Sequence, residues 1–414
     1  MAMTEHDRQI LRDLGRRVAE IAAWPQMEER RQRWYDQNAL RRGRPLVYAS
    51  PEGSWVELIP EDTLQCQDSG ARGIERGLRM RIYAAEHFAD DQVCDAVFRV
   101  PRAVKTTGWG VEPQYTRPAE ARGAYVWDPP IKTRADLERI QTPTAEHDPA
   151  ATQRRLEELG ELFDGILEVR LSGNYFGNAG LIDEWTRLRG IERTFWDMTD
   201  DPQFVHDGMR RLMEGRRALM ESLEAQGLLT LNNENHYVGS GGFGFTHELP
   251  QPDFAGQVRL RDLWGFADAQ TMSEVSPAMH EEFVLQYQLP LLERFGLNCY
   301  GCCEPLHRHL DTLLARVPHL RRISISPWAD RRVSAEKLGN RAIFSWKPNP
   351  AALAAVNFDP DWVRADIRET IAIARANGCV LEMILKDTHT CNHQPERFDQ
   401  WTRIAMEEAE RAGA

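Results

Sequence analysis

The chain has 414 residues, of which 42% are hydrophobic and 28% are charged, a composition typical of a globular protein. Its formal net charge of −12 argues against nucleic acid as a partner, because binding to phosphates requires clustered lysine and arginine. No apolar run approaches the roughly 20 residues of a membrane span. We therefore expect a cytoplasmic protein with no membrane partner, in which the seven cysteines are free thiols.

The N-terminal part of the chain has the pattern of helices. In residues 1–40, apolar residues recur at three- and four-residue spacings, as on one face of a helix. Residues 93–127 are instead rich in β-branched and aromatic residues. We expect residues 1–90 to form an N-terminal helical extension that packs on the following domain.

From about residue 128 onward, strand patterns alternate with helix patterns. Such alternation predicts an α/β fold with a parallel sheet, and the number of units favours a (β/α)8 TIM barrel over residues 91–414. A nucleotide-binding open sheet is less favoured, because no glycine-rich phosphate-binding motif follows an early strand. The predicted strands include ILEVRLSGN, LLTLNNENHY, GLNCYGCCE, RRISISPW, RAIFSWKPN and CVLEMILKDTH.

The active site of such a barrel lies at the carboxyl ends of the strands, so polar residues there are the candidates. One predicted strand end carries Asn232, Glu234 and His236 on a single face, followed by Tyr237 and a glycine-rich loop. The alternative interpretation is a polar strand end with a flexible loop.

A second strand end contains adjacent cysteines. Alternation places Tyr300, Cys302 and Glu304 on one face and Cys303 on the other, so we expect Cys302 to point into the barrel mouth and Cys303 away from it. A thiolate and a carboxylate two residues apart can both bind Zn²⁺. The alternative is that these cysteines are small core residues.

A third strand end contains Lys386, Asp387, His389, Cys391 and His393. The spacing matches no standard zinc finger, but Cys391 is a candidate metal ligand. The alternative is a loop with incidental histidines.

Lysine is scarce, with five residues in the chain, and two of them, Lys347 and Lys386, fall at predicted strand ends. Arginine replaces lysine in most solvated roles, but not where a compact ammonium or a tunable pKa is needed. Trp264 and Trp346 also lie near strand ends, where they either wall an apolar pocket or pack in the core.

Two segments, FGLNCYGCCEPLHRHLDTLL and LEMILKDTHTC, resemble the uroporphyrinogen decarboxylase-like superfamily over roughly residues 90–410. The resemblance is closest to its uncharacterised members, beside the corrinoid-dependent methyltransferases, and it implies a (β/α)8 barrel. The chain lacks the Arg-Gln-Ala-Gly-Arg segment with which true decarboxylases of this family bind substrate carboxylates, so we do not expect porphyrinogen decarboxylation.

The resemblance also implies a zinc site. The methyltransferase branch binds zinc through a His-x-Cys pair and a later cysteine, which correspond here to Tyr300-Gly301-Cys302 and to Cys391. Tyrosine replaces the histidine, so the missing ligand is expected from Glu304, His236 or Glu234.

The leading hypothesis is a zinc-dependent methyltransferase that moves a methyl group between a small-molecule donor or thiol and a corrinoid on a partner protein. The alternatives are a metal-free decarboxylase-like lyase using Lys386, Lys347 and Asp387, and a non-catalytic subunit of a corrinoid system; a homodimer is also considered. The expected catalytic residues are Lys386, His389 and Lys347, and the expected substrate-binding residues are Asn232, Tyr237, Tyr300, Trp264 and Trp346.

Overall fold

The computed structural model describes residues 3–117, 125–173 and 177–413 and shows a mixed α/β fold, as the alternation predicted. Its largest sheet has seven parallel strands, ordered β1-β15-β14-β13-β12-β11-β8. The strands of this sheet are β1 (Leu46–Ala49), β8 (Gly177–Asn178), β11 (Trp264–Ala267), β12 (Leu297–Tyr300), β13 (Leu320–Ile325), β14 (Ile343–Trp346) and β15 (Val380–Leu385).

These strands are buried on both faces. Every residue of β1, β11, β12, β14 and β15 is buried, which explains their nearly continuous apolar sequences. Because the strands are parallel, their carboxyl ends meet at one edge of the sheet. The segments after β12 and β15, which carry the predicted thiols, therefore lie at the same edge.

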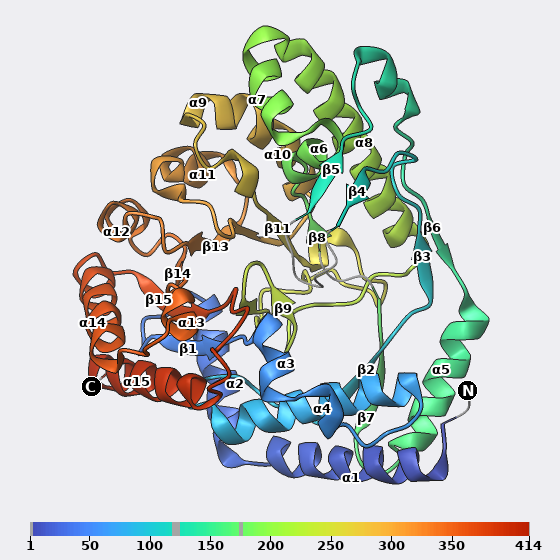
Figure 1. Cartoon of the computed structure of the whole chain (residues 1–414), viewed down its shortest axis with the longest axis vertical. Coiled ribbons are helices and arrows are strands. Elements are labelled where there is room, and N and C mark those ends of the chain that lie inside the picture. The colour runs from blue at the N-terminus through green and yellow to red at the C-terminus, as the bar shows by residue number, and fades with distance from the viewer. Residues whose placement is uncertain (1–2, 118–124, 174–176, 414) are drawn as a thin grey trace.

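Helices connect successive strands and lie on the outside of the sheet (Figure 1). Aspartate N-caps start several of them, for example Asp359 before α14 and Asp330 before α12. A π-helix over Glu281–Leu285 joins α9 to α10. The helices after the first four are α5 (Pro149–Leu162), α6 (Ile182–Arg189), α7 (Ile191–Asp200), α8 (Pro202–Ala225), α9 (Pro277–His280), α10 (Gln286–Leu292), α11 (Leu310–Arg316), α12 (Arg331–Leu338), α13 (Ala351–Ala354), α14 (Pro360–Ala376) and α15 (Glu396–Gly413). Short 3-10 helices cover Glu52–Ser54, Glu61–Thr63, Arg134–Arg139, Leu260–Asp262, Gln270–Met272 and Leu306–Arg308.

The N-terminal region is largely helical, as predicted, but it also supplies a strand to the main sheet. Its helix α1 packs against α4 through the buried side chains of Leu11, Val18 and Leu78, and both run along one side of the molecule (Figure 1). Strand β1 pairs with β15, so residues 1–90 are more than an appended helical layer. The four helices are α1 (Glu5–Ala22), α2 (Pro25–Asn38), α3 (Trp55–Leu58) and α4 (Ser69–His87).

The remaining strands form four separate pairs. Within the described residues, the hydrogen-bonded ladders do not join into a closed ring, so the eight-stranded barrel stays a prediction. The parallel pair is β2 (Val97–Pro101) with β7 (Glu168–Ser172), and the antiparallel pairs are β3 (Val104–Thr106) with β6 (Ala145–His147), β4 (Gln114–Thr116) with β5 (Val126–Asp128), and β9 (Tyr237–Val238) with β10 (Gly242–Phe243).

The predicted strand LLTLNNENHY is wrong. This segment has a single bridge residue, Leu229, and then turns into the short β9–β10 hairpin. The asparagines explain the difference, because their amides bond to distant backbone: Asn232 binds the backbone N–H and carbonyl of Trp264, and Asn233 donates to the carbonyl of Leu249.

The β9–β10 hairpin packs against residues of the main sheet. A Cβ on Gly239 would lie 2.6 Å from Cβ of Cys299, and one on Gly242 would lie 2.3 Å from Cζ of Arg322. Glycine is therefore required where the turn touches strands β12 and β13. In the described ranges, no helix is both long enough and apolar enough to cross a membrane.

Candidate active site

Cys302 and Cys303 lie side by side immediately after β12. Gly301 has a φ of 89°, and a Cβ there would lie 2.3 Å from Leu306, so the turn requires glycine. This turn leaves both cysteines partly exposed, with their Sγ atoms 3.5 Å apart. We expected Cys303 to point away from the mouth that Cys302 faces. This expectation is wrong, because the alternation of the strand ends at Gly301 and the two sulfurs lie together.

The inward and outward faces of β12 are also the reverse of the prediction. The Tyr300 hydroxyl donates to Oε1 of Gln288 at 2.7 Å, and Asn298 donates to the carbonyl of Leu292, so both point to the helices. Cys299 instead faces the guanidinium of Arg322. Tyr300, expected to bind substrate, is only 1% exposed and lies in this helix contact.

Strand β15 delivers Lys386 to the two thiols. Its Nζ lies 3.5 Å from Sγ of Cys302 and 4.0 Å from Sγ of Cys303, and it donates to Oδ2 of Asp387 at 2.6 Å. Sγ of Cys303 is 3.3 Å from the same carboxylate oxygen. The Ser240 hydroxyl, from the β9–β10 turn, donates to Sγ of Cys302 at 3.3 Å. We call Cys302, Cys303, Lys386, Asp387 and Ser240 the thiol cluster.

The thiol cluster favours the thiolate form of Cys302. The hydrogen bond from Cys303 lowers the pKa of Cys302 most; burial opposes it, and the Lys386 ammonium and the Ser240 hydroxyl lower it further, to about 6. The Cys302 thiolate in turn raises the pKa of Cys303. Burial would lower the pKa of Lys386, but the negative charges of Cys302 and Asp387 outweigh it and raise that pKa. At neutral pH the cluster therefore contains a thiolate, a thiol and an ammonium.

Two buried carboxyl groups lie near the cluster. Burial raises the pKa of both Asp268 and Glu304 to about 7. The Glu304 carboxylate accepts hydrogen bonds from the backbone N–H groups of Ala269 and Cys302, each at 2.9 Å, which fixes its position. Such groups can supply or remove a proton near pH 7.

Lys347 lies in a polar network inside the sheet. Its ammonium donates to Ser345, whose hydroxyl donates to the Glu382 carboxylate, and Glu382 is paired with Arg322 at 2.7 Å. Both partners of this pair are at most 2% exposed. Burial lowers the pKa of Lys347 to about 7, with the nearby cations Lys386 and Arg322 acting in the same direction. Near pH 7 the buried Lys347 amine is therefore partly neutral.

Cys391 belongs to a different network. It is fully buried, and its thiol donates to Oε2 of Glu57 at 3.1 Å. Burial, followed by the Glu57 carboxylate, raises the pKa of Cys391 to about 12. His389 lies on the same loop and is exposed. The structure therefore does not show Cys391 beside Cys302 in one set of contacts.

Glu234 and His236 lie in a third network. Glu234 pairs with Arg170 at 3.2 Å and its side chain is 51% exposed. His236 is buried, and burial followed by the Arg99 charge lowers its pKa to about 4. These contacts come from strands β2 and β7, not from the thiol cluster.

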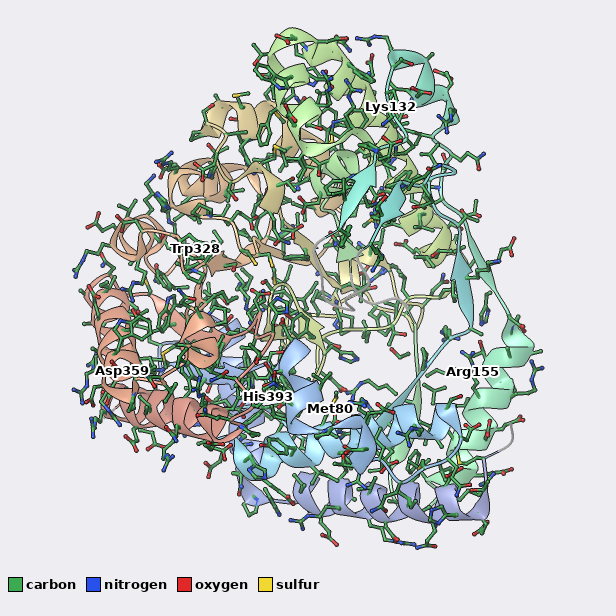
Figure 2. The ribbon with its side chains drawn as sticks, in the orientation of Figure 1. Met80, Lys132, Arg155, Trp328, Asp359 and His393 are labelled. Atoms are coloured by element: carbon green, nitrogen blue, oxygen red, sulfur yellow. The ribbon has the colours of Figure 1, made fainter. Side chains whose placement is uncertain are left out.

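The predicted substrate-binding residues divide in the same way. Tyr237 lies in β9 of the hairpin that carries Ser240, and the Lys386 charge acts on its phenol. Trp264 and Trp346 are packing residues, 1% and 2% exposed, whereas Trp328, labelled in Figure 2, is 69% exposed. Asn232 is held by the backbone of Trp264.

The predicted zinc ligands do not form one site here. Cys302, Cys391 and the pair Glu234 and His236 have separate partners, and the Glu304 oxygens accept backbone N–H groups. Among the described residues, no group of three or more His, Cys, Asp and Glu side chains is arranged to hold a metal ion. The described residues therefore do not fit a zinc ion.

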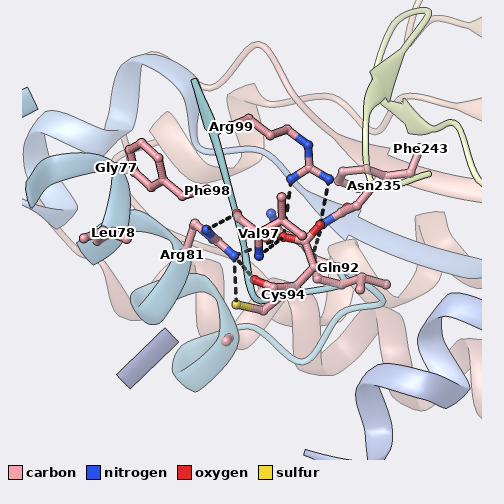
Figure 3. A pocket seen from close by; sticks show the side chains of 13 residues that line it. Gly77, Leu78, Arg81, Gln92, Cys94, Val97, Phe98, Arg99, Asn235 and Phe243 are labelled. Carbon is pink, nitrogen blue, oxygen red and sulfur yellow. Dashed lines mark hydrogen bonds and ion pairs between the residues drawn. The ribbon is translucent and has the colours of Figure 1, made fainter. Parts of the chain in front are cut away.

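A separate cavity of about 320 Å³ lies between α4 and β2 (Figure 3). Two arginines line it, but Arg81 and Arg99 both bind Asp95, at 3.2 and 2.8 Å. The single Asp95 carboxylate binds both guanidinium groups, and no residue of the thiol cluster lines this cavity, so it is not the candidate active site.

The sequence analysis missed some residues in and around these networks. Ser240 had a signal, because glycines on both sides of it indicate a close approach of backbone. Asp268 follows the end of β11, so the strand-end rule would also have selected it. Glu57 had no local signal, because it lies 334 residues from Cys391 in sequence.

The comparisons with known proteins include a distant structural likeness. A solved structure described as a methyltransferase from Methanosarcina mazei aligns with a TM-score of 0.49 and 10% identity, covering 92% of this chain and 98% of that chain. No protein-family model matches the chain, and no curated protein matches it. The likeness is too distant to assign a reaction.

Proposed function

We propose that this chain is a methyltransferase in which Cys302 is the nucleophile. The observation that carries the proposal is the placement of the Cys302 sulfur, with Lys386 at 3.5 Å and Ser240 at 3.3 Å, at the carboxyl edge of the parallel sheet. A thiolate with a depressed pKa is an activated nucleophile. Methyl transfer is chosen because the two segments that supply Cys302 and Lys386 are those that resemble the methyltransferase branch.

In the proposed step, the Cys302 thiolate attacks the methyl carbon of the donor. A carbon–sulfur bond forms, the bond between the methyl carbon and its leaving group breaks, and that electron pair departs with the leaving group. Asp268 or Glu304, whose pKa values are raised to about 7 by burial, supplies a proton when the leaving group requires one. Lys386 holds the thiolate before attack and stays protonated throughout.

A corrinoid on a partner protein belongs to this proposal by resemblance, and would supply the methyl group or receive it. The chain's own residues orient the sulfur. Ser240 fixes it from the hairpin side, and Asp387 holds the Lys386 ammonium in place. Tyr237, on the same hairpin as Ser240, is a candidate to contact the donor.

The test is to incubate the purified protein with methylcobalamin and with a panel of small methyl donors, and to measure methylation by intact-protein and peptide mass spectrometry. One methyl group on Cys302 is expected in the wild type and none in Cys302→Ser. Cys379→Ser is a matched control, because its thiol lies at the opposite end of β15. No transfer from any donor, or unchanged transfer in Cys302→Ser with methylation elsewhere, would contradict the proposal.

A second function rests on the position of Lys347, which directly follows β14 at the carboxyl edge of the sheet and has a buried amine with a lowered pKa. An amine with a pKa near 7 can form a Schiff base with a keto acid, as the lyase alternative requires. Borohydride trapping with short keto acids tests it. A covalent adduct on Lys347 supports the lyase, and adducts that persist in Lys347→Met reject it.

A further inference from the structure

The thiol cluster contains a second sulfur that forms no bond to the methyl group when Cys302 attacks. Cys303 is adjacent in sequence, its Sγ is 3.5 Å from that of Cys302, and both side chains are partly exposed. The Gly301 turn holds both thiols at the same edge. Two sulfurs so close together can bind one soft centre at the same time.

The charges around the pair select against a divalent cation. The Lys386 ammonium lies 3.5 and 4.0 Å from the two sulfurs, so a cation between them would meet a positive charge at short range. The nearest carboxylate, Asp387, is already paired with that ammonium at 2.6 Å. In the part of the chain that the structure describes, no third metal-binding side chain completes a ligand set. A neutral, sulfur-seeking centre avoids this repulsion.

We propose that Cys302 and Cys303 form a dithiol site for neutral trivalent arsenicals. In the binding reaction, two As–OH bonds of an arsonous acid break and two As–S bonds form. The Cys303 thiol supplies one proton and the solvent supplies the second, because Cys302 is already a thiolate. The two hydroxyl groups therefore leave as two water molecules, and neither arsenic nor sulfur changes oxidation state. Asp387, at 3.3 Å from Sγ of Cys303, is placed to accept the proton of that thiol and pass it to the departing hydroxyl group.

Arsenical binding and methyl transfer require different features of the thiol cluster. Methyl transfer depends on the ionised Cys302, whereas arsenical binding depends on two sulfurs. The inference therefore does not rest on methyl transfer, and the two fail separately. Cys303→Ser removes the second sulfur but keeps the Cys302 sulfur, with a hydroxyl in place of the neighbouring thiol as hydrogen-bond donor.

The experiment uses phenylarsine oxide, which is phenylarsonous acid in water, and measures stoichiometry by intact-protein mass spectrometry and affinity by calorimetry. One phenylarsenic group per chain is expected, with the loss of two protons from the protein. Affinity should fall by about 100-fold in either Cys302→Ser or Cys303→Ser, because the second bond is intramolecular. Cys379→Ser should bind like the wild type, and an excess of a small dithiol should release the group.

Wild-type affinity in Cys303→Ser would overturn the proposal. Displacement of the arsenical by equimolar Zn²⁺ would also overturn it, since the site would then prefer a divalent cation. Circular dichroism of both serine variants guards against misfolding. If either variant is unfolded, Cys303→Ala replaces it under the same criteria.

Discussion

Cys302 and Cys391 both follow strands of the same parallel sheet, but their neighbours have opposite charges. A Lys386 ammonium lies 3.5 Å from the Cys302 sulfur, and a Glu57 carboxylate oxygen lies 3.1 Å from the Cys391 sulfur. Together with their other contacts, these neighbours bring the pKa of Cys302 to about 6 and that of Cys391 to about 12. The chemistry of a thiol at a strand end is thus decided by the charge that another segment brings to it.

The difference predicts strong selectivity in alkylation by iodoacetamide. At pH 7 the thiolate fraction of Cys391 is smaller by about 10⁵-fold. A thiolate of low pKa is intrinsically the weaker nucleophile, which offsets about 100- to 1,000-fold of this difference. Cys302 should therefore react about 100- to 1,000-fold faster than Cys391. Time-resolved peptide mass spectrometry measures both rates, and the Cys302 rate should rise with pH to a midpoint near 6 and then level off. Faster labelling of Cys391 would reverse the comparison.

Lys386→Met tests whether the ammonium makes Cys302 different. Removing an opposite charge this close raises a thiol pKa by roughly one to three pH units. The alkylation midpoint of Cys302 should move upward, and the rate at pH 6 should fall by about tenfold. An unchanged midpoint would show that Cys303 and Ser240 alone hold the thiolate. Lys337→Met, on the outer helix α12, is the matched control.

Glu57→Gln tests the other side of the comparison. Burial opposes ionisation of Glu57, but hydrogen bonds from Thr390, Cys391 and His393 outweigh it and lower its pKa to about 2. This group stabilises the fold above its ordinary pKa of 4.5, and the contribution is lost as the pH falls toward 2. The variant should be less stable by about 1–2 kcal/mol at pH 7 in urea titrations. The difference should shrink toward pH 2, and a constant difference would contradict the assignment.

Tyr300→Phe should have the smallest effect on Cys302. The hydroxyl binds Gln288 and His280, and it shares no partner with the Cys302 sulfur. Alkylation of Cys302 should therefore change by less than about threefold. A larger change would mean that Tyr300 acts at the mouth after all, as the sequence alternation suggested.

The ends of the strands could be predicted from the sequence, but the side chains that contact those ends could not. The β/α alternation predicted the parallel sheet, and the strand-end rule selected Cys302 and Lys386, which are in contact. The faces of β12 were inverted because period-two alternation does not say which face is inside. The Arg322–Glu382 pair, which occupies the inside, joins residues 60 positions apart.

The predicted zinc ligands also show that contacts between distant segments cannot be predicted from a local pattern. Cysteine at two strand ends is a local pattern, whereas the partner of Cys391 lies on α3, far away in sequence. Sequence periodicity cannot predict that the Glu57 carboxylate, from the N-terminal region, contacts the Cys391 thiol near the C-terminus. The N-terminal segment also supplies β1, so it contributes to the site's surroundings more than its helical pattern indicated.

The reactivity of Cys302 depends on how the β9–β10 hairpin packs against the sheet. Its turn touches Cys299 and Ile384 through Gly239 and Gly241, and its Ser240 hydroxyl reaches the Cys302 sulfur. Whatever withdraws the hairpin from the sheet also removes a donor from the thiolate. The rate at which a small reagent labels the Cys302 sulfur therefore reports whether the β9–β10 turn, more than 60 residues earlier in the chain, is packed against the sheet.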